Sequence, residues 1–178
     1  MTRTLLTCVI ATFLALGCAR APETRAEQNS LEAQADAALA SMTREDPSLG
    51  EMLSNAAGYV VFPEVGEAGF IASGSAGVGV VYEDGAPIGF AELREGSVGA
   101  QVGGQTFSQL IVFESQSALD RLKSNNFDLT ADTSATAITS GAAASVQFED
   151  GAAVFIEDEA GLMVEAAVGG QSITFVPG

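Results

Sequence analysis

Apolar residues recur at every second position along much of the chain after residue 58, which is the pattern of strands that bury a face of a sheet. It predicts one group of strands and then, after a helix, a second group arranged as a meander. The predicted strands cover residues 59–63, 69–82, 88–93, 98–102 and 107–113, then 145–149, 152–157, 162–168 and 172–176. Asp84-Gly85 and Asp150-Gly151 are typical of two-residue hairpin turns. The small-residue stretch 128–144 predicts no particular element.

Residues 30–45 show helical spacing instead, with Asn29 or Ser30 available as the N-cap. One interpretation is that the apolar stripe of this helix packs on the sheet. The other is that the helix faces a membrane or a partner through Leu31, Leu39 and Met42. Its polar face carries acidic residues and no lysine, which weakens the membrane interpretation. The whole stripe consists of Leu31, Ala35, Ala38, Leu39 and Met42.

Two shorter helices complete the predicted elements. Pro47 separates the first helix from a second over residues 48–57, and Ser115 caps a third helix. Together the elements predict an α+β fold: one antiparallel, β-rich domain with a meander or barrel-like sheet and two or three short helices, of which the N-terminal ones pack on the sheet. This domain is expected over residues 30–178, with a helical part at 30–57 and a β-rich part at 58–178.

The first eighteen residues, MTRTLLTCVIATFLALGC, predict a targeting segment. Arg3 precedes an apolar run over residues 5–16, which is too short to span a membrane as a helix. The run ends in Gly17 and Cys18 and resembles the lipobox of bacterial lipoproteins, although Ala15 stands where leucine is commoner. The resemblance implies cleavage between Gly17 and Cys18 and attachment of fatty acids such as palmitate at Cys18. The alternative is an ordinary signal peptide with an incidental cysteine.

Residues 1–17 are accordingly interpreted as a signal peptide, and residues 18–29 as a flexible tether because they lack apolar periodicity. Two or more acyl chains would anchor the protein stably, since each buried CH₂ contributes about 0.8 kcal/mol. Ala19, rather than aspartate, follows Cys18. By resemblance to Gram-negative lipoproteins, this favours the outer membrane, with the domain facing the periplasm.

The charge of the chain argues against nucleic acid as a partner. The sequence has 7 basic and 23 acidic residues, for a formal net charge of −16. Phosphate binding needs clustered lysine and arginine, and electrostatic docking on anionic lipid needs a basic segment. The simplest role of the acidic residues is to keep the protein soluble.

The sequence offers few residues for familiar enzyme chemistry. It has no histidine, and its two cysteines, Cys8 and Cys18, lie in or directly after the predicted signal peptide. Zinc sites, disulfide frameworks and His-based triads are therefore not expected. Lys123, the single lysine, is expected to be solvated. We predict no enzyme, no metal and no cofactor, and we expect solvated acids rather than a calcium site or a glycosidase pair at the hairpin ends, namely Glu149, Asp150, Glu157 and Asp158.

Several segments between residues 56 and 176 resemble, in the same order, the SYLF domain, a lipid-binding module of bacteria and eukaryotes. The segments are AAGYVVFPEVGEAGFIASGSAGVGVVY, GSVGAQVGGQTFSQLIVFES, ALDRLKSNNFDLTAD and EAGLMVEAAVGGQSITFVP. The chain departs from the family at Phe90, where many members have tryptophan. It also has Thr130-Ala131-Asp132 in place of Gly-Ala-Asp and Ser140-Gly141-Ala142 in place of a turn with proline.

The resemblance implies a binding protein. Eukaryotic members of the family bind phosphoinositides through a basic surface and an amphipathic helix, and some fungal members bind actin, whereas this chain lacks the basic surface. We therefore expect a lipid or another hydrophobic ligand in a groove between helices and sheet, at the membrane surface. The alternative is a structural or interaction protein of the envelope, which binds a protein partner through its acidic domain and contacts lipid only through Cys18.

The lipid anchor can be tested at the residue that would carry it. Cys18→Ala removes the thiol that would carry the acyl chains, so the variant should leave the membrane fraction and lose all labelling by radioactive palmitate. The matched control is Cys8→Ala, which should change neither result. Labelling that persists in Cys18→Ala would contradict the anchor site.

Overall fold

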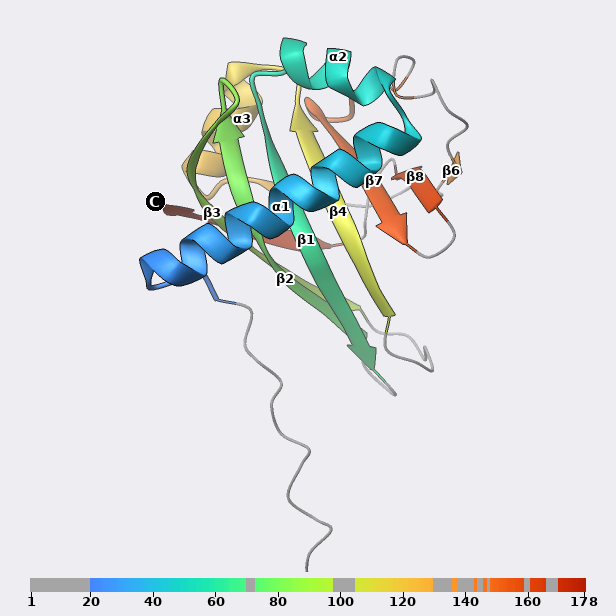
Figure 1. The fold of residues 1–178 in the computed structure, drawn as a ribbon. Coiled ribbons are helices and arrows are strands. Elements are labelled where there is room, and N and C mark those ends of the chain that lie inside the picture. The colour runs from blue at the N-terminus through green and yellow to red at the C-terminus, as the bar shows by residue number, and fades with distance from the viewer. Residues whose placement is uncertain are drawn as a thin grey trace, which may run out of the picture.

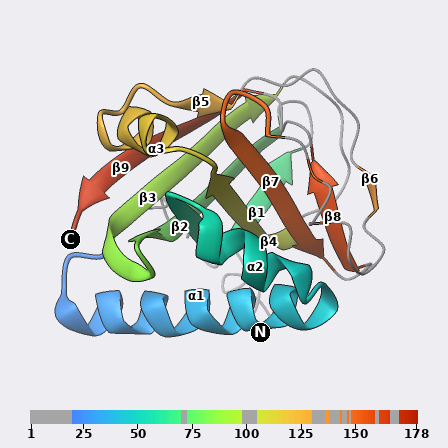
Figure 2. The ribbon, with the colours of Figure 1, turned by 90° about the horizontal axis from the view of Figure 1, so that it is seen from above.

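The computed structural model describes residues 20–69, 73–97, 105–129, 136–137, 143, 146, 148–158, 161–165 and 170–178. Within these residues the strands form one curled antiparallel sheet, and helices cover both of its faces (Figures 1 and 2), which confirms the predicted fold class. The strand order across the sheet is β5-β9-β3-β2-β1-β4-β7-β8-β6. The strands are β1 (Gly58–Gly69), β2 (Ser73–Glu83), β3 (Ala86–Ser97), β4 (Gln105–Phe113), β5 (Asp128–Leu129), β6 (Thr136–Ala137), β7 (Ala152–Asp158), β8 (Gly161–Glu165) and β9 (Gln171–Pro177).

The first helix, α1 (Arg25–Glu45), begins earlier than residue 30, where the sequence pattern placed its start. Its N-cap is Thr24, whose hydroxyl oxygen accepts the N–H of Glu27 at 3.3 Å. The carboxylate of Glu27 in turn accepts the N–H of Thr24 at 2.9 Å, and this reciprocal pair is a capping box. Residues 25–29 are therefore helical, and the prediction of a flexible tether up to residue 29 is wrong for them.

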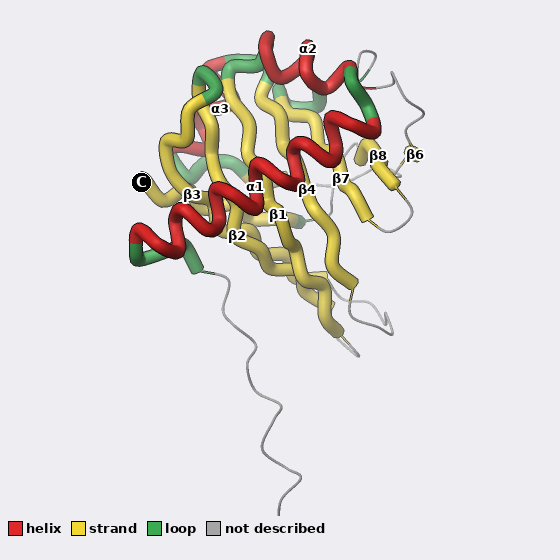
Figure 3. The backbone as a smooth tube through the Cα atoms, in the orientation of Figure 1, coloured by secondary structure: helices red, strands yellow, loops and turns green. Residues whose placement is uncertain are grey.

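The other two helices follow the sequence signals closely. α2 (Ser48–Asn55) begins directly after Pro47 and ends two residues before the predicted limit of residue 57. α3 (Gln116–Lys123) is capped by Ser115, whose hydroxyl oxygen accepts the N–H of Ala118 at 3.4 Å. Figure 3 shows α1 and α2 over one side of the strands, with α3 at the opposite side.

Side chains of the central strands alternate between two separate cores. Val60 and Phe62 of β1 lie in the core under α3, whereas Val61 of the same strand lies in the core under α1 and α2. The core on the side of α3 includes Val60, Phe62, Val81, Leu93, Ile111, Phe113, Leu119, Leu122, Phe127 and Val154. The core on the side of α1 includes Ala35, Met42, Leu49, Val61, Val80, Tyr82, Phe90, Leu110, Val112, Phe155 and Leu162.

A β-bulge bends β1 at its proline. The register of β1 shifts against both neighbouring strands between Val61 and Val65, around Pro63. Proline cannot donate a ladder hydrogen bond, and a bulge is one of the few positions in a sheet that tolerates it. The neighbouring strand β2 approaches closely here: a Cβ atom on Gly79 would lie 2.7 Å from the carbonyl oxygen of Val61 and 2.8 Å from the ring of Phe62.

Both predicted Asp-Gly turns are confirmed. Asp84 and Gly85 have φ angles of 52° and 74°, and Asp150 and Gly151 have φ angles of 50° and 78°. Two consecutive positive φ angles define the turn that matches the twist of a tight hairpin. The two turns join β2 to β3 and Glu149 to Ala152 at the start of β7.

The predicted C-terminal meander is wrong in two respects. β9 does not pair with β8 but crosses to the other side of the sheet and pairs with β3, from Gly89 opposite Pro177 to Glu95 opposite Gln171. The predicted strand 145–149 is absent at its described residues apart from the bridge at Glu149. The predicted strand 98–102 lies outside the described residues, and the unassigned stretch 128–144 contributes the two-residue strands β5 and β6.

The close approach at the bulge predicts that alanine in place of glycine changes the stability in opposite directions at Gly79 and at Gly50. Gly79→Ala should lower the free energy of unfolding by about 1–3 kcal/mol, because the new methyl group overpacks the site. Gly50→Ala in α2 is the matched control, since a Cβ atom there meets only Thr43 Cγ2, at 3.9 Å. It should raise the stability by up to about 1 kcal/mol, from the higher helix propensity of alanine. Urea denaturation measures both values, and equal effects would contradict the close approach.

Candidate ligand-binding site

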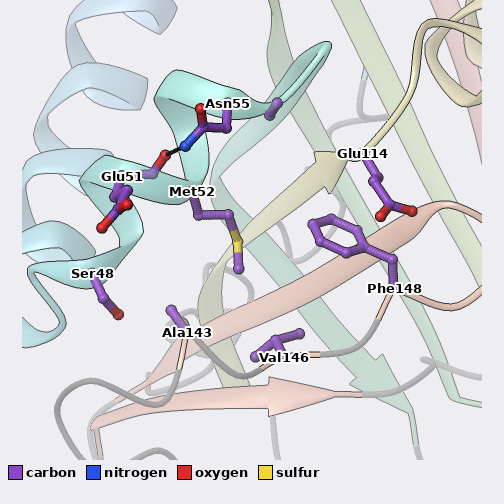
Figure 4. Close-up of a pocket in the computed structure, with 9 residues that line it drawn as sticks. Ser48, Glu51, Met52, Asn55, Glu114, Ala143, Val146 and Phe148 are labelled. Atoms are coloured by element: carbon purple, nitrogen blue, oxygen red, sulfur yellow. Dashed lines mark hydrogen bonds between the residues drawn. The ribbon is translucent and has the colours of Figure 1, made fainter.

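A pocket of about 370 Å³ lies between α2 and the segment that leads into β7 (Figure 4). α2 and the residue after it form one wall, and three residues of the 143–148 segment form the other. Glu114, which follows β4, completes the rim. The lining residues are Ser48, Glu51, Met52, Asn55, Ala56, Glu114, Ala143, Val146 and Phe148.

The apolar part of the lining continues the core on the side of α1. Met52, Val146 and Phe148 are each half-buried and pack against the buried residues of that core. In Figure 4 the side chains of Met52 and Phe148 extend toward each other from opposite walls, with Val146 below them. The pocket is thus an opening into an apolar layer that no helix or strand of the described residues covers.

A buried carboxylate fixes the two walls relative to each other. Asp46 lies between α1 and α2 and is only 1% exposed. One of its oxygens accepts the N–H and the hydroxyl of Ser48, at 3.0 and 2.7 Å, and so holds the start of α2. The other oxygen accepts the N–H of Ala143, at 2.9 Å, 97 positions further along the chain. Because both oxygens are used, Asp46 sets the position of Ala143 in the opposite wall.

The rim of the pocket is acidic. Glu51, in the first turn of α2, and Glu114 are both exposed, and they stand on opposite sides of the pocket in Figure 4. Among the described residues, neither carboxylate has a hydrogen-bond or ion-pair partner, and no basic residue belongs to the lining. The side-chain amide of Asn55 already has a partner in the protein, because it donates to the carbonyl oxygen of Glu51 at 2.9 Å.

The stripe of α1 packs on the sheet, as the first of the two interpretations predicts. Met42 is fully buried, and Leu31 and Leu39 are half-buried against the same core. A polar contact supports this packing, because the hydroxyl of Tyr82 donates to Asp36 at 3.1 Å. The proposed outward role of Met42 is therefore wrong, since its side chain has no exposed surface.

Burial also shapes the acidity of the two tyrosines beneath α1. Tyr59 and Tyr82 stack with ring centroids 4.8 Å apart. Burial raises the pKa of both hydroxyls, and the negative charge of Asp36 raises each pKa further. The raised pKa therefore keeps the hydroxyl of Tyr82 a donor to Asp36 to a higher pH than an ordinary tyrosine would allow.

The structure does not bring the other candidate residues together as a site. Gly17 and Cys18 lie outside the described residues. Lys123 is paired rather than freely solvated, since its ammonium group lies 2.9 Å from Glu83, and this bond lowers the pKa of the Glu83 carboxyl. Among the described residues no group of three or more His, Cys, Asp or Glu side chains could hold a metal ion. The candidate acids occupy the two ends of β7: Glu149 and Asp150 before it, Glu157 and Asp158 at its end.

A polar pair inside the sheet was not expected from the sequence. Gln109 of β4 and Gln171 of β9 are fully buried, and the amide of Gln109 donates to the carbonyl oxygen of Gln171 at 2.9 Å. Gln171 also donates to Glu95, at 3.1 Å. The pair joins two strands that are not neighbours in the sheet, so it holds the curled sheet across its interior.

Comparison with known families finds a match over most of the C-terminal half of the chain. Residues 94–176 match the family model described as Ysc84, Las17-binding protein actin regulator. The match supports a SYLF domain. The matched segment runs from the end of β3 into β9 and contains Glu114, Ala143, Val146 and Phe148 of the pocket.

The part of the SYLF resemblance that precedes residue 94, including β1 and β2, lies outside the matched segment. No curated protein matches the chain. Within the residues that the structure describes, none of the helices combines the length and the apolar character needed to cross a membrane.

The role of Asp46 gives a stability prediction. Asp46→Ala leaves the N–H of Ala143 and the first turn of α2 without their acceptor, and the free energy of unfolding should fall by about 2–3 kcal/mol. Asp46→Asn should also destabilise, because its NH₂ group would face a donor in place of one oxygen. Glu64→Ala, at an exposed carboxylate on β1, is the control and should stay within about 0.5 kcal/mol of wild type. Equal urea midpoints for Asp46→Ala and Glu64→Ala would contradict the role.

Proposed function

We propose that this protein is a lipid-anchored envelope protein whose SYLF domain binds lipid or another hydrophobic ligand at the membrane surface, without catalysis. The observation that carries the binding role is the pocket between α2 and the 143–148 segment. Its volume of about 370 Å³ falls in the range of roughly 300–1,000 Å³ that is usual for ligand sites. Its apolar side chains are accessible although they adjoin a closed core, which suits an apolar ligand.

The anchor would place this pocket close to a bilayer. We propose that Cys18 carries acyl chains in the outer membrane and that the domain faces the periplasm. The chain between Cys18 and the start of α1 at Arg25 can span only about 25 Å when fully extended. Part of it already contacts the domain, because the N–H of Ala21 donates to Glu92 at 2.8 Å. The short connection supports a ligand that is taken from, or delivered to, the membrane surface.

The pocket can be tested with a neutral fluorescent probe, N-phenyl-1-naphthylamine, and the purified protein. Met52→Ala and Phe148→Ala each remove apolar contact area, so the Kd for the probe should rise at least about fivefold. Leu53→Ala is the matched control, since Leu53 is a neighbouring half-buried residue of α2 that is not part of the lining. It should leave the Kd unchanged. Circular dichroism checks that all three variants are folded, and equal Kd values for the three would contradict the pocket.

A protein partner is the second candidate, and the description of the matching family favours it, because that description names the binding of a protein, Las17. In this case the acidic domain would bind one envelope protein, and only the acyl chains on Cys18 would contact lipid. Crosslinking in cells should then capture a single dominant partner with both wild type and Phe148→Ala. A mixture of products without a dominant partner would count against it.

A further inference from the structure

We propose that the domain meets the bilayer through one defined face, the surface around the start of α1, and that this face lies on the phosphate-bearing head-group layer. The inference rests on the proposed lipid anchor and adds which side of the domain the anchor turns toward the membrane. We call this surface the anchor patch, and it consists of the charged residues Arg20, Glu23, Arg25, Glu27, Glu92 and Arg94.

The chain is bound to the domain almost directly after the proposed anchor. The N–H of Ala21 donates to Glu92 of β3 at 2.8 Å, and Ala21 packs half-buried against the core under α1. The carboxylate of Glu27 accepts the N–H groups of Glu23 and Thr24, at 3.1 and 2.9 Å, and so joins the same segment to the first turn of α1. From Ala21 onward the chain is therefore fixed to both the sheet and the helix.

The connection between the proposed acylated residue and this fixed segment is short. Cys18 precedes Ala21 by three residues, so their Cα atoms can lie at most about 11 Å apart. At physiological ionic strength the Debye length is about 8 Å. The charges of the anchor patch and of the lipid head groups are therefore close enough to interact in spite of screening by salt.

The anchor patch has no net formal charge, because its three arginines and three glutamates balance. Arg20 contacts Glu23 at 2.8 Å, and its side chain remains 73% exposed. Arg94 lies 3.5 Å from Glu92, and its side chain remains 62% exposed. Both arginines are therefore accessible to lipid phosphates.

The charge of the rest of the chain orients the domain. Outside the anchor patch, the chain after Cys18 has 20 acidic and three basic residues. An anionic lipid surface repels this acidic part and does not repel the neutral patch. Because α1 and α3 lie on opposite sides of the sheet (Figure 2), the side of α3 faces the water when the anchor patch lies on the head groups.

The test is contact quenching in vesicles of phosphatidylethanolamine and phosphatidylglycerol that carry the intact acylated protein. A bimane fluorophore is attached either at Ala26→Cys, an exposed position in the first turn of α1, or at Asn126→Cys, an exposed position directly after α3. Lipids with a nitroxide on the head group should quench bimane at position 26 and leave bimane at position 126 unchanged. Equal quenching at both positions, or stronger quenching at position 126, would overturn the anchor patch.

Two variants with the same change of charge test the hydrogen bond between Ala21 and Glu92. Glu92→Gln keeps a side-chain oxygen that can accept the N–H of Ala21, so the quenching at position 26 should stay at the wild-type value. Glu92→Ala removes the acceptor, and the quenching should fall. The same quenching in both variants would overturn the role of this bond. A protein that does not float with the vesicles would contradict the proposed anchor itself, whereas uniform quenching of a protein that does float overturns the anchor patch alone.

Discussion

Burial of the central strands on both faces is the constraint on which the structure depends. The apolar residues in the first half of β1 alternate between two cores, so Val60 and Val61 face different helices although they are neighbours in the chain. A shift of one residue in register would exchange the two sets of side chains. The bulge at Pro63 is the single place where this alternation is interrupted along β1, and the sheet bends there. α3 fills the inside of the curl, and α1 and α2 cover the outside (Figure 2).

Local signals in the sequence predicted most of the elements. The period of two located β1 to β4 and β7 to β9 approximately, and the Asp-Gly pairs and Ser115 marked turns and a cap that the structure contains. The start of α1 was missed because residues 25–29 lack apolar periodicity. The signal that would have found it is Thr24 followed by Glu27, the spacing of a capping box.

Long-range features could not be predicted in the same way. The strand pattern of β9 fits either edge of the sheet, because pairing with β8 or with β3 buries the same alternate residues. In the sequence Asp46 is an ordinary polar residue between two predicted helices. Its hydrogen-bond partner Ala143 lies in a stretch whose residues predict no helix or strand. The pocket depends on that contact, so the sequence suggested a groove between helices and sheet but none of the residues that line it. The sequence placed acids at hairpin ends and on a helix, whereas the structure shows which carboxylates lie beside an apolar opening.

The place of β9 has a consequence for the order of folding. The free edge of β3 has no partner until residues 171–177 have been made, although β1, β2 and β3 can pair with one another much earlier. During synthesis this edge is a template for strands of other chains, as unpaired edges are in general. The buried bond between Gln109 and Gln171 can form only at the same late step. Chaperone protection would accordingly matter most in the interval between the appearance of β3 and the arrival of β9.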